Sequence, residues 1–142
     1  MCSDTLSDGF RYARQVQFGE TDMAGIVHFS WMYRYMEEAE HALWRAAGMH
    51  IARFGEETSW PRLSASFDFK NPLYFEDEFE VVVKIDAVSR RTIRYACTIV
   101  RGDTTIGTGV MTTVHVRKGP PLKAIEIPEE VIAKLQEVGG RR

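Results

Sequence analysis

The sequence has little cysteine and no long apolar run. Only Cys2 and Cys97 occur among 142 residues, which is too few for a disulfide framework and is typical of a protein from a reducing compartment. No stretch approaches the roughly eighteen apolar residues of a membrane span, and the first residues lack the apolar core of a secretory leader. We therefore expect a cytoplasmic protein with no membrane partner.

The sequence also lacks an excess of charge of either sign. Its 18 Lys and Arg residues stand against 20 Asp and Glu residues, a net charge of -2, which argues against a nucleic-acid partner. It contains no P-loop, no dinucleotide fingerprint and no Gly-x-Ser-x-Gly nucleophile motif. The isolated Gly107-Thr108-Gly109 lies in a strand-like run and indicates a bulge.

The length of 142 residues favours a single domain. A chain of this size buries about two-thirds of its unfolded surface and needs no disulfide or metal for stability. We expect one domain over residues 1–142, with a flexible leader at 1–9 and a flexible tail at 139–142.

One long helix is predicted over residues 31–47. Ser30 is the expected N-cap and Gly48 the expected residue after the C-cap. The apolar residues of this segment recur at the spacing of one helical face, namely Met32, Tyr35, Met36, Ala39, Ala42, Leu43 and Ala46.

Most of the remaining chain reads as strands. Alternating or valine-rich runs predict strands at 10–18, 62–69, 77–88, 91–101 and 105–116, and a short helix at 128–138. One long helix with one antiparallel sheet indicates an α+β fold in which the sheet wraps around the helix. Such a sheet has open edges, which favours pairing with a second copy.

The loop from Gly19 to Phe29 is the candidate site. Asp22 has two interpretations: it stabilises a turn through an Asx hydrogen bond, or it is a catalytic carboxylate beside a helix N-terminus. The second arrangement suits acyl transfer, because free backbone N–H groups can hold a polarised carbonyl oxygen. A metal site of Glu20, Asp22 and His28 lacks a dependable ligand spacing, so no metal is expected.

A second candidate cluster is Ser89-Arg90-Arg91-Thr92, at a break between two predicted strands. Such a turn is either solvated surface or a phosphate-binding site, because Arg forks and hydroxyl groups suit phosphate oxygens. Lys118 and Lys123 join the same cluster if the sheet order brings their loops together.

The stretch FGETDMAGIV at residues 18–27, followed by the aromatic helix, resembles the hotdog-fold acyl-CoA thioesterases. The closest likeness is to the 4-hydroxybenzoyl-CoA thioesterase branch, with its motif FGDxDPAGIV, and it continues through residues 65–67, 89–92 and 122–128. The resemblance implies a hotdog fold, an acyl-CoA substrate and no cofactor or metal. It also implies a sheet-paired homodimer, often assembled as a dimer of dimers.

The resemblance further implies roles for individual residues. Asp22 corresponds to the catalytic carboxylate, acting as nucleophile or as general base, and the backbone N–H of Phe29 to the group that polarises the thioester carbonyl. The CoA phosphates are expected at the basic cluster, on Arg90, Arg91, Lys123 and Thr92.

His28 departs from the family pattern, because it stands where the motif has an aromatic residue. It adds an ionisable group to the candidate site. Two alternatives therefore stay open: a hydratase or dehydratase with His28 as base and Glu37 as acid, and a non-catalytic acyl-thioester binding module. The aromatic residues suit either an aromatic acyl group or the core, namely Trp31, Tyr35, Trp60 and Phe67.

Overall fold

The structure is a computed structural model that describes residues 9–139. Most of the predicted leader, including Cys2, and residues 140–142 of the predicted tail lie outside the described residues. None of the helices within 9–139 is long and apolar enough to cross a bilayer.

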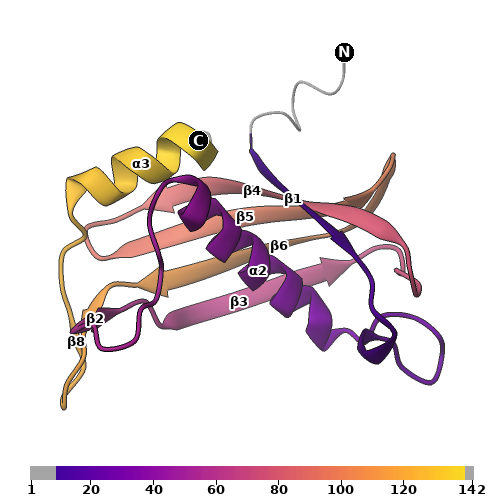
Figure 1. Ribbon diagram of the computed structural model, residues 1–142, viewed down its shortest axis with the longest axis horizontal. Helices are drawn as coiled ribbons and strands as arrows, with labels where there is room; N and C mark the ends of the chain where they lie inside the picture. The colour runs from indigo at the N-terminus through magenta and orange to yellow at the C-terminus, as the bar shows by residue number, and fades with distance from the viewer. Residues whose placement is uncertain (1–8, 140–142) are drawn as a thin grey trace.

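A five-stranded antiparallel sheet forms the body of the molecule (Figure 1). The strand order is β1-β4-β5-β6-β3, so β1 and β3 are the two edges. The predicted strands are confirmed within one or two residues, except that the first ends at Gln15 and is followed by a 3-10 turn, η1 (Phe18–Glu20). The strands are β1 (Phe10–Gln15), β3 (Arg62–Phe69), β4 (Glu78–Val88), β5 (Thr92–Arg101) and β6 (Thr104–Val114).

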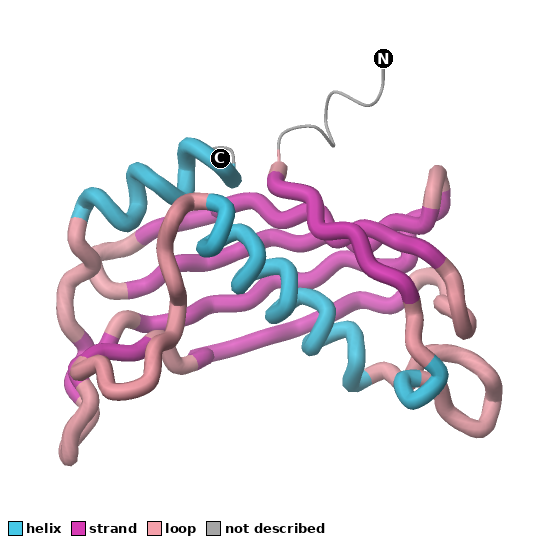
Figure 2. Tube along the Cα trace, viewed as in Figure 1, coloured by secondary structure: helices cyan, strands magenta, loops and turns pink. Residues whose placement is uncertain are grey.

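The long helix α2 (Ser30–Ala46) crosses one face of this sheet (Figure 2). Its C-terminus has the predicted glycine: Gly48 has a φ of +82°, and the Met49 N–H donates to the Trp44 carbonyl at 2.9 Å. The N-cap prediction is wrong, because Ser30 is already helical and Phe29 is the N-cap.

The buried face of α2 differs from the predicted one at its C-terminal half. Ala46 is exposed, whereas Glu40 and Trp44 are buried. Glu40 can be buried because Arg62 donates to both of its oxygens, at 2.8 and 3.0 Å. Trp44 donates its indole N–H to the Tyr95 hydroxyl at 2.9 Å. The predicted residues that are fully buried are Met32, Tyr35, Met36, Ala39 and Leu43.

A second, small sheet corrects the prediction of a single one. It consists of β2 (Thr58–Ser59), β7 (Val116–Arg117) and β8 (Lys123–Ala124). The predicted C-terminal helix is α3 (Glu129–Gly139), which packs against α2 and β4.

Gly107 and Gly109 make room on β6 for the ring of Phe67. A Cβ at either glycine would lie within 2.4–2.8 Å of that side chain. In the pairing of β5 with β6, Ile99 lies opposite Gly107 and Val100 lies opposite Thr105, so the register shifts there. The predicted bulge therefore lies next to the glycine pair. The close approach places an aromatic ring on the sheet beneath α2.

Candidate active site

Asp22 begins a tight turn that Gly25 closes. The Gly25 N–H donates to the Asp22 carbonyl at 2.9 Å, and Gly25 has a φ of +84°, which disfavours any other residue. Asp22 Oδ1 accepts the Ala24 N–H at 2.8 Å. The Asx interpretation is therefore confirmed for one carboxylate oxygen, while Oδ2 accepts no hydrogen bond from residues 9–139.

The turn is the tip of a short hairpin. The Asp22 N–H donates to the Ile26 carbonyl at 2.8 Å, and the His28 N–H to the Glu20 carbonyl at 2.9 Å. The Val27 N–H donates to the Leu73 carbonyl at 2.9 Å, and this hydrogen bond attaches the hairpin to the body of the protein. The chain therefore returns from Asp22 directly to the start of α2.

The N-terminus of α2 has one backbone donor to spare. The Trp31 and Met32 N–H groups donate to the His28 and Phe29 carbonyls, and the Ser30 N–H approaches His28 Nδ1 at 3.3 Å. Within residues 9–139 no acceptor is paired with the Phe29 N–H. It is the free donor that the helix dipole reinforces.

Asp22 and Phe29 line one cavity of about 470 Å³. Phe69 stands edge-on to Phe29, with ring centroids 6.4 Å apart, and Lys70 adds a cationic side chain. The lining of one cavity thus includes the acid Asp22, the residue with the free N–H and several apolar side chains. The other lining residues are Ile26, Val27, Met32, Asn71 and Pro72.

His28 is not among the residues that line this cavity. Its Nδ1 lies 2.9 Å from Ser30 Oγ, and its ring is 4.7 Å from that of Phe29. Glu37 lines a different cavity of about 250 Å³, beside Arg62. His28 and Glu37 are the two residues that a hydratase would require. Neither of them lines the cavity that Asp22 lines.

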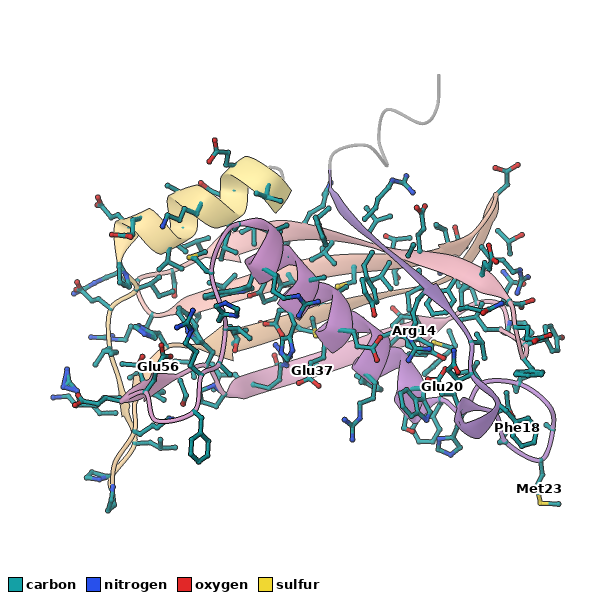
Figure 3. The ribbon with its side chains drawn as sticks, in the orientation of Figure 1. Arg14, Phe18, Glu20, Met23, Glu37 and Glu56 are labelled. Atoms are coloured by element: carbon teal, nitrogen blue, oxygen red, sulfur yellow. The ribbon has the colours of Figure 1, made fainter. Side chains whose placement is uncertain are left out.

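The Glu20 carboxylate accepts hydrogen bonds from Arg14 and Tyr35, and Figure 3 shows Arg14 and Glu20 close together. Burial alone would raise its pKa, but hydrogen bonds from Arg14, the Gln17 N–H and Tyr35 outweigh burial and hold the pKa below its usual value. Residue type and spacing indicate Glu20 only as a candidate metal ligand. Its partners lie on other elements, so no local signal identifies this contact.

The predicted basic cluster is brought together only in part, because neither Lys118 nor Lys123 is among the residues that line its cavity. Arg90, Arg91 and Thr92 line a cavity of about 630 Å³ at the β4–β5 turn. The C-terminal segment passes over this turn, because the Ile127 N–H donates to the Arg90 carbonyl at 2.9 Å. That segment includes β8, which carries Lys123.

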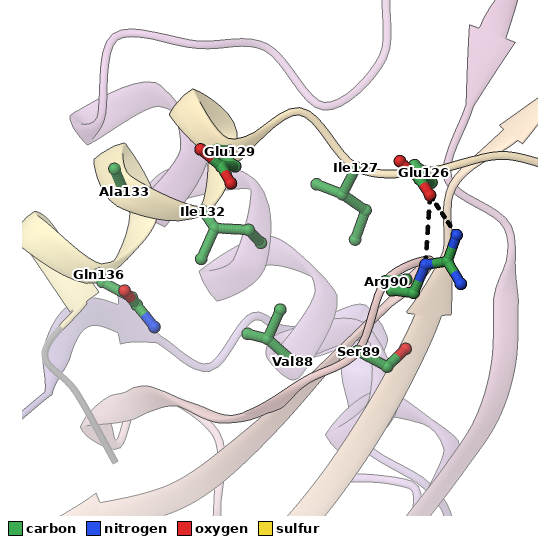
Figure 4. Close-up of a pocket in the computed structure, with 9 residues that line it drawn as sticks. All are labelled: Val88, Ser89, Arg90, Glu126, Ile127, Glu129, Ile132, Ala133 and Gln136. Carbon is green, nitrogen blue, oxygen red and sulfur yellow. Dashed lines mark hydrogen bonds and ion pairs between the residues drawn. The ribbon is translucent and has the colours of Figure 1, made fainter.

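Arg90 is already engaged by an acid. Its guanidinium forms an ion pair with Glu126 (Figure 4), and its Nε lies 3.2 Å from Glu126 Oε2. The neighbouring cavity, of about 670 Å³, lies between the turn and α3, with Val88 and Ile132 in its wall. A phosphate that binds Arg90 must therefore compete with the Glu126 carboxylate.

The loop that follows β1 and the turn between β4 and β5 lie at opposite ends of the sheet (Figure 1). The Asp22 loop follows β1, whose Gln15 pairs with Glu78 at the start of β4, whereas the Arg90 turn follows Val88 at its end. At the usual rise per residue these ends are about 33 Å apart. One chain therefore does not bring all the predicted site residues together.

Known proteins share both the sequence pattern and the fold. Residues 16–135 match the profile of the thioesterase-like superfamily. A hypothetical protein of known structure from Aquifex aeolicus is 33% identical with a TM-score of 0.82, over 89% of this chain and 98% of that one. The structure of a gentisyl-coenzyme A thioesterase is 25% identical with a TM-score of 0.80, over 88% and 98%.

A 1,4-dihydroxy-2-naphthoyl-CoA hydrolase from Synechococcus elongatus is 28% identical over 88 residues, which are 60% of this chain and 65% of that protein. The profile match spans most of the chain, and the neighbouring structures have the same helix-on-sheet architecture. The chain therefore belongs to the thioesterase-like superfamily, as a thioester hydrolase with the hotdog fold.

Proposed function

We propose that the chain hydrolyses an aromatic acyl-CoA to a free carboxylate and CoA, with Asp22 as the catalytic carboxylate. The observation that carries the proposal is the cavity that Asp22 shares with Phe29. Thioester hydrolysis needs a group that attacks or activates water and a donor for the oxyanion. The carboxylate and the free Phe29 N–H supply these two functions.

Two routes are compatible with this pair of groups. In one, an Asp22 oxygen attacks the carbonyl carbon, CoA leaves as a thiolate that takes up a proton, and water then hydrolyses the mixed anhydride. In the other, Asp22 takes a proton from the water that attacks. A single turnover in heavy-oxygen water separates them, because only the first route can leave label in the Asp22 side chain.

The CoA phosphates are assigned to Arg90, Arg91, Lys123 and Thr92. The Arg forks match phosphate oxygens, and the Thr92 hydroxyl lies in the same cavity wall as both arginines. In one chain this cluster is at the far end of β4 from Asp22, and β4 spans about 33 Å. The proposal therefore takes the two halves of the site from different copies.

The open edge of β3 supports an antiparallel pairing of two copies. No strand in the described range pairs with the outer edge of β3, and its side chains Leu63 and Phe69 are 61% and 51% exposed. A twofold axis at this edge would set the Phe69 end of one chain beside the Arg62 end of the other. The Asp22 cavity is at the Phe69 end of β3, and the basic turn is at the Arg62 end.

This pairing gives a homodimer with two composite sites, and a dimer of dimers is a further expectation. Light scattering after size exclusion measures the assembly. A Leu63→Lys substitution on the β3 edge should shift it toward monomer, because it removes an exposed apolar side chain from the proposed contact.

Aromatic rings in the cavity wall, and Phe67 next to it, support an aromatic acyl group. Phe29, Phe69 and Phe67 form a series of edge contacts, with ring centroids 6.4 and 4.9 Å apart. The two relatives named for their substrates act on hydroxylated aromatic acyl groups. These observations support an aromatic over a saturated acyl chain.

The test is thiol release from a panel of aromatic, short-chain and long-chain acyl-CoA substrates. We expect the highest kcat/KM with an aromatic acyl group, and at least about a hundredfold loss of kcat in Asp22→Asn. The Asn oxygen can still accept the Ala24 N–H, so this variant should fold and bind CoA. Near-normal hydrolysis by Asp22→Asn would contradict the assignment.

Two other outcomes point elsewhere. Stabilisation by CoA without hydrolysis of any panel member would favour the binding module. Hydration of an enoyl thioester without thiol release would favour the hydratase.

A further inference from the structure

Glu20 is a buried carboxylate that the proposed reaction does not use. Only 4% of its surface is exposed. Arg14 donates to both of its oxygens, at 3.0 and 2.6 Å, the Tyr35 hydroxyl donates at 2.7 Å, and the Gln17 N–H donates at 2.9 Å. A buried charge with this many donors is fixed in one geometry.

The donors tie the Asp22 loop to the long helix. Tyr35 is on α2 itself, and Arg14 also contacts that helix by donating to the two Glu38 oxygens at 3.0 and 3.1 Å. Figure 3 shows Arg14 and Glu20 together where β1 and the loop meet α2. Glu20 therefore joins three segments: β1, the loop and the helix.

The backbone of Glu20 holds the other side of the hairpin. Its carbonyl accepts the His28 N–H at 2.9 Å, and His28 directly precedes Phe29. Asp22 lies two residues after Glu20, on the same strand of the hairpin and across from the strand that carries His28. Both groups that line the reaction cavity are thus attached to this one residue over very short stretches of chain.

We infer that Glu20 is a positioning residue, which fixes the Asp22 carboxylate relative to the Phe29 N–H by anchoring their hairpin to α2. The inference rests on the proposed function, because it assigns Glu20 a role in that reaction. Misplacement of a catalytic group by about 1 Å can cost about a hundredfold in rate. Loosening the anchor should therefore lower turnover.

Glu20→Gln is the sharpest change at this position. The side chain keeps its length, but one oxygen becomes an NH₂ group that faces donors from Arg14, Gln17 or Tyr35. At least one of these hydrogen bonds must break, because two donors cannot pair. The hairpin then loses part of its attachment to α2.

Glu40→Gln is the matched control. Glu40 is likewise buried, with 0% exposed, and Arg62 donates to both of its oxygens. Glu40 is on α2, as Tyr35 is, but it makes no hydrogen bond to the Asp22 loop. Loss of stability alone should affect both variants, whereas loss of positioning should affect only Glu20→Gln.

The experiment uses two readouts on the full chain at a temperature where each variant is folded. The first is amide hydrogen exchange at Asp22 and His28, which reports opening of the hairpin. The second is kcat and KM for the best aromatic acyl-CoA. We expect Glu20→Gln to speed exchange at both amides and to lower kcat at least about tenfold with KM within about threefold, and Glu40→Gln to change neither.

A second pair of variants applies if Glu20→Gln does not fold. Tyr35→Phe removes one hydroxyl that binds Glu20, and Tyr95→Phe removes one that accepts from Trp44. Both tyrosines are fully buried. Only Tyr35→Phe should speed exchange at His28 and lower kcat, by about threefold or more.

The possible outcomes separate this inference from the proposed function. Unchanged exchange in Glu20→Gln or Tyr35→Phe would overturn the anchoring role, whatever the activity. Faster exchange with unchanged kcat would overturn the link to catalysis. A wild-type chain that hydrolyses no acyl-CoA would refute the proposed function and the catalytic role of Glu20 with it, and exchange would then report on the anchor alone.

Discussion

The Asp22 Oδ1 atom accepts the Ala24 N–H at 2.8 Å, while Oδ2 has no donor within the described residues. One oxygen of the same carboxylate therefore shapes the turn, and the other stays available to a substrate. The turn-forming and catalytic interpretations of Asp22 are compatible, because they use different atoms. Substitutions can therefore test the conformation of the turn separately from the catalytic groups.

Replacing Phe29 by Pro should remove the proposed oxyanion donor without removing a hydrogen bond. The φ of Phe29 is -55°, which a Pro ring accepts, and its N–H is unpaired in the described chain. We expect Phe29→Pro to lower kcat about a hundredfold or more. Thiol release and a thermal melt of the same sample provide the measurement.

Phe29→Ala is the control for that prediction, because it removes the ring and keeps the N–H. It should change KM for an aromatic acyl-CoA more than kcat. Equal kcat values for the Pro and Ala variants would show that the Phe29 N–H does not hold the oxyanion.

Replacing Gly25 by Ala should alter the turn at Asp22. Gly25 has a φ of +84° and no atom near an added Cβ, so the cost is backbone strain of about 1–2 kcal/mol. Relief of that strain would move Asp22, and kcat should fall. Gly55→Ala, at a φ of +89° and equally open, should lose similar stability in denaturant titrations and keep its kcat.

Removing the Glu126 charge should improve binding of CoA substrates. Glu126→Gln would release Arg90 from its ion pair and make its fork available to phosphate. We expect KM for acyl-CoA to fall by about twofold to fivefold at low salt, with kcat unchanged. Arg90→Ala should raise KM instead. The matching acyl-pantetheine thioester lacks phosphates, and an equal effect on its KM would contradict this explanation.

Cys97 should be unreactive in the folded protein. It is 2% exposed, and burial raises the pKa of its thiol to about 12, so roughly one molecule in ten thousand carries the thiolate at pH 8. In a Cys2→Ser chain, a disulfide reagent should react slowly with native protein and at once after addition of denaturant. Fast reaction with native protein would show that β5 opens readily.

The Asp22 loop was predictable because its signals are local. The turn residues, the glycine and the helix start follow one another between Asp22 and Ser30, so a short motif identifies them. The anchor of the loop was not predictable in this way. Arg14 and Tyr35 meet Glu20 only after β1 and α2 have packed, and neither residue differs in sequence from an ordinary surface or core side chain.

The distinction between local and long-range contacts also explains the errors in the predicted fold. Hydrophobic spacing identified most of the core face of α2, but the predicted face includes the exposed Ala46 and leaves out the buried Glu40. The burial of Glu40 depends on Arg62, which is 22 residues away and invisible to a helical pattern. Strands of two residues, such as Thr58–Ser59, are too short to show any alternation.

The length of β4 has a consequence for mixtures of defective chains. Asp22 and the arginine turn stand at its opposite ends, so each proposed site takes its carboxylate from one chain and its phosphate-binding groups from another. An Asp22→Asn chain and an Arg90→Ala/Arg91→Ala chain should therefore complement each other when co-refolded. At equal amounts and low substrate, random pairing restores one intact site in half of the dimers, or roughly a quarter of wild-type activity.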